Sequence, residues 1–269
     1  MKNTICTYDK NTKLNYKIHD LIAQCLDGCD RFLKDLKANK PDSFLTIIES
    51  LKGFYEKIEN YEVTFKSDFE ILNQYPVLVN GSKNHVLSLV GYSKYNPPSI
   101  EVEIEIYTLD LVRTFTHFEY FLMESLLKIM NREEAIEYIK NLSDEVSLSR
   151  RNPNNYVDSF EESVERFKNN LGRWRMQECI TGSLDEDKLL YKVKKCEWAK
   201  VLKGFDSELC YAMLCYSDFQ GAQNLNPNFI LTRTKTLMMG DDYCDFCYHD
   251  TRKDKDLNHP SESEFKALG

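Results

Sequence analysis

Apolar and polar positions in the first sixty residues alternate with the period of a helix. One apolar stripe repeats every three or four residues: Leu21, Ile22, Cys25, Cys29, Phe32, Leu33 and Leu36. This spacing predicts an amphipathic helix, and Pro41 fits the first turn of a second one. Cys25 and Cys29 lie one turn apart and could clamp a metal ion. Their place on the stripe favours packing in a core, because a free cysteine behaves as a small hydrophobe.

The stretch 77–106 has the pattern of strands. Residues 77–79 run into Asn80-Gly81, a frequent turn dipeptide, and a second apolar run follows at 85–90. Over 100–106, isoleucine and valine alternate with glutamate, which predicts a half-buried strand with an acidic outer face. The two prolines before it predict a linker or boundary at about 96–99.

The region from 108 to about 171 again has a helical pattern. Asn131 and Glu134 are spaced as a capping box, in which each side chain bonds the backbone of the other residue, so we expect a helix to begin there. His117 lies among aromatic residues at helical spacing. We interpret it as a packing histidine, with a catalytic role as the alternative.

Short elements alternate beyond residue 172. A strand is expected near Met176, followed by two short helices at about 192–203 and 207–217, the second capped by Asp206. Residues 229–238 alternate as a strand, 240–242 make a turn and 243–249 return. The polar tail 253–269 is a candidate for disorder.

These elements predict an α+β fold, a helix-rich body packed on an antiparallel sheet with a C-terminal β-hairpin at 229–249 lining a pocket. Three segments are expected: a mostly helical N-terminal extension with a few strands at 1–105, a main domain at 106–252, and the tail at 253–269.

Composition excludes several classes of function. The net charge of −8 argues against a nucleic-acid partner, and no apolar run is long enough to cross a membrane. The N-terminus lacks a signal peptide, so we expect a cytoplasmic protein with nine reduced cysteines. With ten glycines and no phosphate-binding loop, a nucleotide cofactor is not expected.

The densest candidate chemistry lies near the end of the chain, at Cys244, Cys247 and His249. A zinc site would need a bulge, because residues three apart on a strand point to opposite faces, so we predict no metal and keep zinc as an alternative. By the same alternation His249 is a poor base for a Cys244 nucleophile, whose partners must come from Arg233, Thr236 or the Asp218 loop. The alternative is that Cys244 only packs beneath the sheet.

Several short motifs occur in a fixed order along 106–252: Arg132-Glu133-Glu134-Ala135, Cys196-Glu197-Trp198, Leu214-Cys215, Asp218, Asn226-Pro227, Arg233-Thr234-Lys235-Thr236-Leu237, Gly240-Asp241 and Cys244-Asp245-Phe246. In order and spacing they resemble the L-2-amino-thiazoline-4-carboxylic acid hydrolase family. The last motif is also similar to four-vinyl-reductase-type ligand-binding domains.

The resemblance implies a hydrolase of a cyclic amidine-like C–N bond that opens 2-amino-thiazoline-4-carboxylate to N-carbamoyl-cysteine. It implies a small-molecule substrate and no cofactor. Carried onto this sequence, it assigns catalytic roles to Cys244 and Cys215 as thiols and to Asp218 or Asp241 as acid/base. The substrate-binding residues it implies are Arg233 as a carboxylate clamp, Asn226 and Thr236 as polar support, Cys196 and Phe246.

Two other functions stay open at this point. The protein could be another biosynthetic enzyme on this fold that forms or rearranges a sulfur- or nitrogen-containing ring, or a non-catalytic small-molecule-binding module. Residues 1–105 lie outside the resemblance and could cover the pocket, recruit a partner or form a homodimer.

Overall fold

A computed structural model describes residues 4–6, 9–58, 60–61, 65, 68–92, 95, 99–174, 176–184 and 187–269. The side chains of 4–6 and 170–174 are outside this description, as is the expected boundary at 96–98. The chain divides into two compact units. We call residues 13–135 the helical unit, and residues 1–12 together with 136–269 the sheet unit. The mixed α+β class predicted from the sequence is confirmed.

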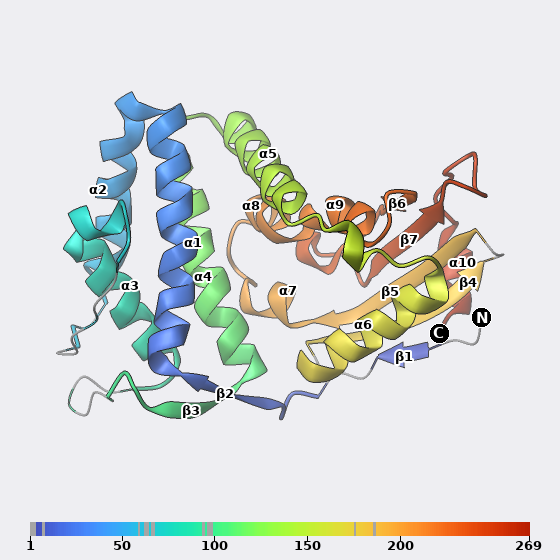
Figure 1. Ribbon diagram of the computed structural model, residues 1–269, viewed down its shortest axis with the longest axis horizontal. Helices are drawn as coiled ribbons and strands as arrows, with labels where there is room; N and C mark the ends of the chain where they lie inside the picture. The colour runs from blue at the N-terminus through green and yellow to red at the C-terminus, as the bar shows by residue number, and fades with distance from the viewer. Residues whose placement is uncertain are drawn as a thin grey trace. The chain divides into compact units, whose positions relative to one another are not determined.

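The helical unit joins four helices to a two-stranded antiparallel sheet (Figure 1). Its elements are β2 (Lys13–Lys17), α1 (Ile18–Asn39), α2 (Phe44–Tyr55), α3 (Pro76–Leu89), β3 (Glu103–Tyr107) and α4 (Thr108–Leu126). Short 3-10 turns precede α2 and α3, at Pro41–Ser43 and Leu72–Gln74. The glutamates of β3 are exposed, as its alternating pattern predicts.

The N-terminal stripe forms the core of the helical unit. Cys25 and Cys29 are buried on α1, in a row with Leu21, Ile22 and Leu33. The prediction that these two thiols pack in a core is therefore confirmed. The predicted capping box is also present: the Glu134 amide donates to Asn131 Oδ1 at 2.9 Å, and the Asn131 amide donates to Glu134 Oε2 at 3.2 Å. It begins α5 (Arg132–Ser149).

The strands expected at 77–90 are wrong, because this stretch is the helix α3. Pro76 occupies its first turn, where a missing amide hydrogen is tolerated. Gly81 serves packing here rather than a turn. A Cβ atom at this position would lie 2.4 Å from Cγ of Tyr55, so only glycine lets that ring lie against the helix.

The sheet unit is built on a five-stranded sheet in the order β1-β4-β5-β7-β6, and every neighbouring pair is antiparallel. The strands are β1 (Thr4–Cys6), β4 (Gln177–Leu184), β5 (Lys188–Cys196), β6 (Phe229–Thr232) and β7 (Cys244–Asp250). The helices are the rest of α5, α6 (Phe160–Trp174), α7 (Glu197–Val201), α8 (Ser207–Cys210), α9 (Ser217–Leu225) and α10 (Glu262–Ala267).

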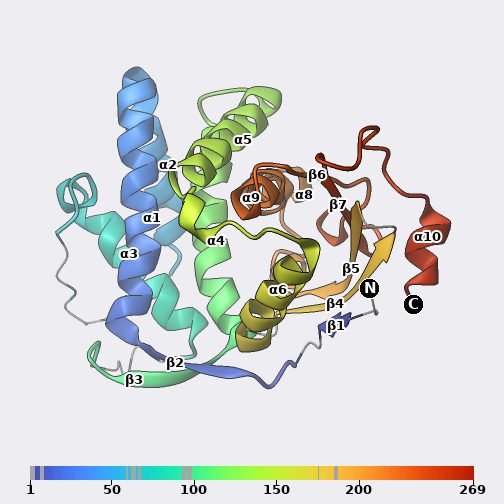
Figure 2. The ribbon, with the colours of Figure 1, turned by 45° about the vertical axis from the view of Figure 1, so that its right-hand side comes forward.

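Helices cover both faces of this sheet (Figure 2). On one face Phe160 and Val164 of α6 pack against Cys244, Phe246 and other sheet residues. On the opposite face Phe265 of α10 packs against Cys247. The predicted alternation of β7, with Cys244 and Phe246 on one face and Cys247 on the other, is confirmed.

Two element boundaries expected in this unit are wrong, and so is the expectation of a disordered tail. The helix expected at 192–203 is the end of β5 followed by the short α7, and the strand expected at 229–238 ends at Thr232. A 3-10 turn, Leu237–Met239, takes its place. The tail, a candidate for disorder, carries α10, which docks on the sheet because Lys192 Nζ donates to the Phe265 and Gly269 carbonyls, each at 3.0 Å.

Candidate active site

The segment between β6 and β7 leaves the sheet. Its backbone amides donate hydrogen bonds to side-chain carboxylates rather than to a neighbouring strand. The amides of Thr234 and Lys235 donate to Asp245 Oδ1 at 2.9 and 2.6 Å. The Thr236 amide donates to Asp241 Oδ2 at 2.7 Å, and the Asp241 amide returns a bond to the Thr236 carbonyl. Gly240 closes the turn at a φ of 98°, a left-handed conformation that favours glycine. Residues 233–236 are therefore held as an irregular loop.

Arg233 is the central cation of this loop. Its side chain is only 2% exposed, and its guanidinium donates to Asp218 Oδ2 and to the Cys215 carbonyl, each at 2.8 Å. The guanidinium carbon also lies about 5 Å from the centres of three aromatic rings, those of Tyr211, Phe219 and Phe246. An arginine stacked on rings and bonded to a carboxylate is strongly held in one place.

The partners of Arg233 come from a short irregular helical segment. Asp206 caps α8 by accepting from the amides of Glu208 and Leu209, which confirms the predicted cap. The helix then widens into a π-helical turn, Tyr211–Cys215, before α9 begins. Such turns occur often at functional sites. Here the turn supplies the Tyr211 ring and the Cys215 carbonyl to Arg233.

Two cavities of small-molecule size adjoin the loop. The first, which we call the arginine cavity, has a volume of about 410 Å³ and is lined by Ile136, Lys140, Glu208, Tyr211, Arg233, Thr234, Lys235, Thr236, Met239 and Asp241. The second, the lysine cavity, has a volume of about 440 Å³ and is lined by Lys195, Cys196, Glu197, Ala199, Lys200, Lys203 and Leu237. Both lie within the sheet unit.

Cys244 lies next to residues that line each cavity. Its Sγ accepts from the Leu237 amide at 3.3 Å and donates to Thr236 Oγ1 at 3.6 Å. Burial raises the pKa of the Cys244 thiol, and the Asp218 charge adds to this rise, while the Leu237 amide, the Thr236 hydroxyl and the Arg233 charge act to lower it. Cys244 itself is buried and lines neither cavity.

Cys196 lines the lysine cavity directly and caps α7. Burial raises the pKa of its thiol to about 11, and the amides of Ala199 and Trp198 oppose that rise. Gln177, opposite Cys196 in the sheet, donates to its Sγ at 3.9 Å. The thiol is therefore protonated at neutral pH.

The third thiol is Cys215, and it lies close enough to Cys196 and Cys244 for their charges to affect its pKa. Burial and the Asp218 carboxylate raise the pKa of Cys215 strongly, with only Arg233 acting against them. Burial also raises the pKa of the Asp218 carboxyl, although Arg233 opposes this. Asp218 is the more accessible member of its ion pair, with 39% of its side chain exposed.

The structure brings together most residues predicted from the sequence: Cys196, Cys215, Asp218, Arg233, Thr236, Asp241, Cys244 and Phe246. Asn226 is not among them. Its amide group donates to the Val157 carbonyl at 2.7 Å and accepts from the Asn228 amide at 2.8 Å, so it fixes the start of β6.

Sequence reasoning missed Tyr211, Phe219, Gln177 and Lys140. Tyr211 and Phe219 flank the Cys215 and Asp218 motifs, and aromatic residues beside an expected arginine were a usable signal. Gln177 and Lys140 gave no signal, because they reach the site through the β4–β5 register and through α5.

No three histidine, cysteine, aspartate or glutamate side chains in the described part of the chain come together in a way that could hold a metal ion. Within the same residues, none of the helices combines the length and apolar content that crossing a bilayer requires.

The fold and the site define an α+β protein in which cavities of small-molecule size adjoin a group of thiols and a buried arginine. A family model for L-2-amino-thiazoline-4-carboxylic acid hydrolase matches residues 113–248, just over half of the chain, and the chain belongs to this family. Membership of this family implies hydrolysis of the aminothiazoline carboxylate. No curated protein matches the chain.

Proposed function

We propose that the protein hydrolyses L-2-amino-thiazoline-4-carboxylate, or a close heterocyclic relative, in the arginine cavity, with Cys244 as the nucleophile. The observation that carries this proposal is that two residues lining the cavity of about 410 Å³ are bonded to the candidate catalytic groups: Arg233 pairs with Asp218, and Thr236 contacts the Cys244 thiol. All of these residues lie in the stretch that matches the family.

The charges around the arginine cavity suit a substrate that carries both an amidine and a carboxylate. Lys140, Arg233 and Lys235 line it together with Glu208 and Asp241. Both terminal amino groups of Arg233 are already hydrogen-bonded, to Asp218 and to the Cys215 carbonyl. Arg233 therefore attracts a carboxylate by its charge rather than by two parallel hydrogen bonds. We therefore assign the substrate carboxylate to Lys140 and Lys235, beside Arg233.

Cys244 is the preferred nucleophile because the Leu237 amide donates to its sulfur and the Arg233 charge acts on it. A thiolate is the attacking form, and an amide hydrogen together with a nearby guanidinium stabilises it. At Cys215 only Arg233 favours ionisation, and the adjacent Asp218 is the second-largest influence against it. At Cys244 Asp218 also opposes ionisation, but as the smallest of the influences, and the Leu237 amide favours it. Cys196 lines the other cavity and serves as the second candidate.

The reaction needs one group that accepts and returns protons, and we propose that this group is Asp218. The substrate amidine binds protonated, which makes its C2 carbon electrophilic. Cys244 adds to C2 while Asp218 accepts the thiol proton, and a raised pKa makes Asp218 a better base for this step. The bond from C2 to the ring sulfur then breaks, rather than the ring C–N bond expected from the sequence, because N-carbamoyl-cysteine keeps the ring nitrogen on this carbon and has a free thiol. Asp218 returns the proton to that sulfur. The whole opened substrate stays attached to Cys244 as an isothiourea.

Water completes the reaction. It adds to the same carbon, with Asp218 accepting one proton, and the C2–S bond to Cys244 breaks as the new hydroxyl proton passes to the thiol. The products are N-carbamoyl-cysteine, the free enzyme and one proton from the amidinium. Net, water has been added to the amidine carbon and the ring has opened.

The first test is mass spectrometry of the full-length protein incubated with L-2-amino-thiazoline-4-carboxylate. We expect a product one water heavier that carries a new free thiol. A new primary amine in place of the thiol would mean that the ring C–N bond breaks, which contradicts the proposed sequence of steps. Saturable binding with no product would indicate a binding module instead.

A second test asks which cavity holds the substrate. Lys140→Met should raise KM about tenfold or more with kcat nearly unchanged, as expected when a charge contributes equally to ground-state and transition-state binding. Lys200→Met is the matched control in the lysine cavity. The reverse pattern would move the substrate to the lysine cavity and make Cys196 the nucleophile.

A further inference from the structure

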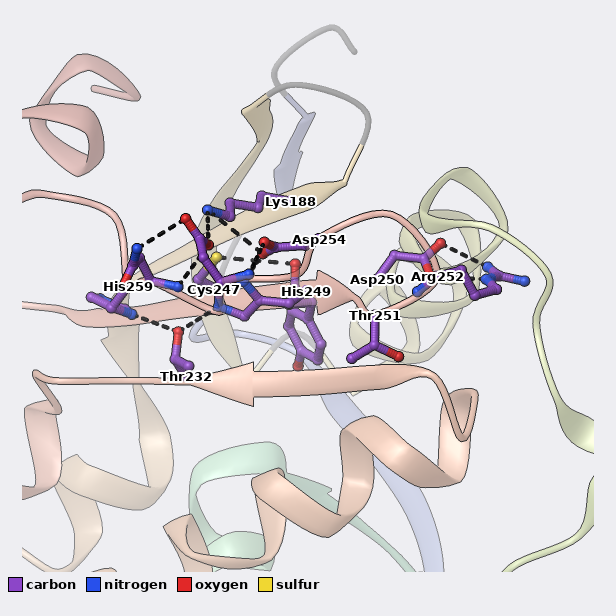
Figure 3. A network of polar contacts seen from close by, with 12 residues as sticks. Lys188, Thr232, Cys247, His249, Asp250, Thr251, Arg252, Asp254 and His259 are labelled. Atoms are coloured by element: carbon purple, nitrogen blue, oxygen red, sulfur yellow. Dashed lines mark hydrogen bonds and ion pairs between the residues drawn. The ribbon is translucent and has the colours of Figure 1, made fainter.

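A chain of polar contacts lies on the sheet face opposite Cys244, where β6, β7 and the C-terminal segment meet (Figure 3). It runs from Asp254 through His249, Thr232 and His259 to Asp245. We call these five residues the histidine relay. The four contacts along it are short: Asp254 Oδ2 to His249 Nδ1 at 2.5 Å, His249 Nε2 to Thr232 Oγ1 at 2.7 Å, Thr232 Oγ1 to His259 Nδ1 at 2.8 Å, and His259 Nε2 to Asp245 Oδ2 at 3.0 Å.

The relay has more contacts than neutral side chains have hydrogens to fill. Each of the four contacts needs one hydrogen between its two heavy atoms. A neutral imidazole has one N–H, the threonine hydroxyl has one hydrogen, and an ionised carboxylate has none. Two neutral histidines and Thr232 therefore supply three hydrogens for four contacts. With each histidine donating to its own aspartate, both remaining ring nitrogens would present lone pairs to the single Thr232 hydrogen.

We propose that the histidine relay holds one additional proton, and that this proton ties the C-terminal segment to the loop that lines the arginine cavity. With it, one imidazole donates both to its aspartate and to Thr232, and Thr232 donates to the other. All four contacts are then satisfied. This inference goes beyond the proposed reaction and does not depend on it.

The link to the cavity passes through Asp245. Besides His259, its carboxylate accepts from the Thr234 and Lys235 amides and from the Thr234 hydroxyl. Burial would raise the pKa of Asp245, but the hydrogen bonds from His259, Thr234 and Lys235 outweigh it and lower the pKa. Asp245 is therefore ionised, and it positions the cavity loop rather than touching the substrate.

The charges around the relay are consistent with one added proton. Both carboxylates are nearly inaccessible, and His249 is fully buried. Lys188 Nζ lies 3.5 Å from Asp254 and 3.3 Å from Asp256, so its charge is shared with an exposed carboxylate. The other ionisable groups nearby are Cys247 and Asp187 on the sheet side, and Lys235, Glu262, Glu264 and Lys266 on the side of α10.

Neither Cys247 nor Glu262 removes the need for the proton. Burial raises the pKa of Cys247 to about 12, so its thiol stays neutral. Glu262 is neutralised by Lys235 at 3.2 Å and Lys266 at 3.0 Å. Phe265 covers His259, with the two rings stacked 5.5 Å apart, which limits the access of water to that imidazole. Without the added proton, the relay carries two negative charges largely out of water.

The direct test reads the protons on the histidine nitrogens of the full-length protein. The chain has five histidines, so ¹⁵N-histidine labelling gives a spectrum simple enough to assign. Substituting the three others one at a time, as in His19→Gln, leaves the relay intact and completes the assignment. The measurement is made at pH 8, where an ordinary histidine with a pKa of about 6.5 is only about 3% protonated.

We expect hydrogens on three of the four ring nitrogens of His249 and His259, one of them on a nitrogen that faces Thr232. Only two hydrogens on these four nitrogens at pH 8 in the folded protein would overturn the proposal. A matched pair of variants extends the test. Thr232→Val removes both middle contacts, so two neutral histidines suffice and the added proton should be lost, whereas Thr232→Ser should keep it.

The same pair tests the link to the cavity. Hydrogen exchange of the Thr234 and Lys235 amides should become at least about tenfold faster in Thr232→Val than in Thr232→Ser, because His259 no longer bridges to Thr232. Equal exchange in both variants would contradict the positioning role. If the valine variant fails to fold, the wild-type spectrum alone still decides the proton count.

Discussion

The two units bury their cysteines in different surroundings. In the helical unit Cys25 and Cys29 lie on the apolar stripe of α1, and the Cys25 thiol donates to the Thr114 carbonyl at 3.8 Å. In the sheet unit the Cys244 sulfur accepts from an amide and lies beside a hydroxyl and within the field of Arg233. Burial raises the pKa of all three thiols.

This difference shows that burial alone does not mark a functional cysteine. Donors directed at sulfur stabilise a thiolate, whereas a carbonyl acceptor stabilises the thiol. By this criterion Cys25 and Cys29 are structural and Cys244 is suited to nucleophilic attack. Matched substitutions in the two units should therefore have different consequences.

The greatest loss is expected from Cys244→Ala. Removing the proposed nucleophile should lower turnover of the thiazoline carboxylate by at least about 10³-fold, the scale on which catalytic nucleophiles act. The protein should still fold, as judged by circular dichroism. Cys25→Ala is the matched control and should keep kcat within about twofold; comparable losses of turnover in both variants would remove the contrast between the units.

The second largest effect is expected on stability, from substitution of the buried Arg233. Arg233→Met leaves Asp218 without its partner and three rings without their cation, so we expect a loss of about 3–5 kcal/mol in the free energy of unfolding by urea. Arg252 is the control: it also pairs with a carboxylate, Asp250, and lies over a ring, Phe229, but it is 42% exposed. Arg252→Met should cost no more than about 1 kcal/mol.

A buried histidine makes the helical unit sensitive to acid. Burial, with the His117 charge, lowers the pKa of His85 from 6.5 to about 4. The unfolded chain then binds a proton near pH 6.5 that the folded chain does not, so stability falls as the pH drops from about 6.5 to 4 and is unaffected by this group above that range. The full effect is about 3 kcal/mol, from about 1.4 kcal/mol per pH unit.

His85→Phe isolates this contribution. The free energy of unfolding by urea is measured for wild type and variant between pH 7 and pH 4. Lowering the pH should reduce it more in the wild type than in the variant, because only the wild type gains a proton at this position on unfolding. A constant difference between the two proteins across that range would show that His85 does not titrate in this way.

A minor effect is expected from Cys29→Ala. Replacing a small buried hydrophobe should lower the unfolding free energy by about 1 kcal/mol and leave KM and kcat unchanged. A change in either kinetic constant would mean that the helical unit contributes to catalysis through this thiol.

The sequence predicts those elements whose signal is local. Helical periodicity identifies α1 and the structural role of Cys25 and Cys29, and the spacing of Asn131 and Glu134 identifies the start of α5. Period-two alternation places Cys244 and Cys247 on opposite faces of β7, and the same pattern is enough to separate Cys244 from His249.

Errors arise where distant contacts override local preference. Asn80-Gly81 has the local chemistry of a turn, yet Gly81 serves the packing of Tyr55 inside a helix. Lys192, Lys194 and Lys195 have helical propensity, yet Lys192 lies in a strand that pairs with β4 and β7, and its ammonium bonds carbonyls more than seventy residues away.

The sequence predicts which residues form the candidate site, but not which of them contact one another. Order and spacing of the motifs identify Arg233, Asp218, Cys215 and Cys244. No local pattern shows that Arg233 is already bonded to Asp218, or that Thr232 joins two histidines, because these contacts depend on how β6, the π-helical turn and the tail meet.

Trapping the attached intermediate tests directly whether Cys244 attacks the substrate. The protein is quenched in acid during turnover of L-2-amino-thiazoline-4-carboxylate, and its peptides are mapped by mass spectrometry. We predict a gain equal to the mass of one intact substrate, because ring opening releases no fragment, located on the peptide that contains Cys244. The same gain on the Cys196 or Cys215 peptide, with Cys244 unmodified, would contradict the assignment of Cys244 as the nucleophile.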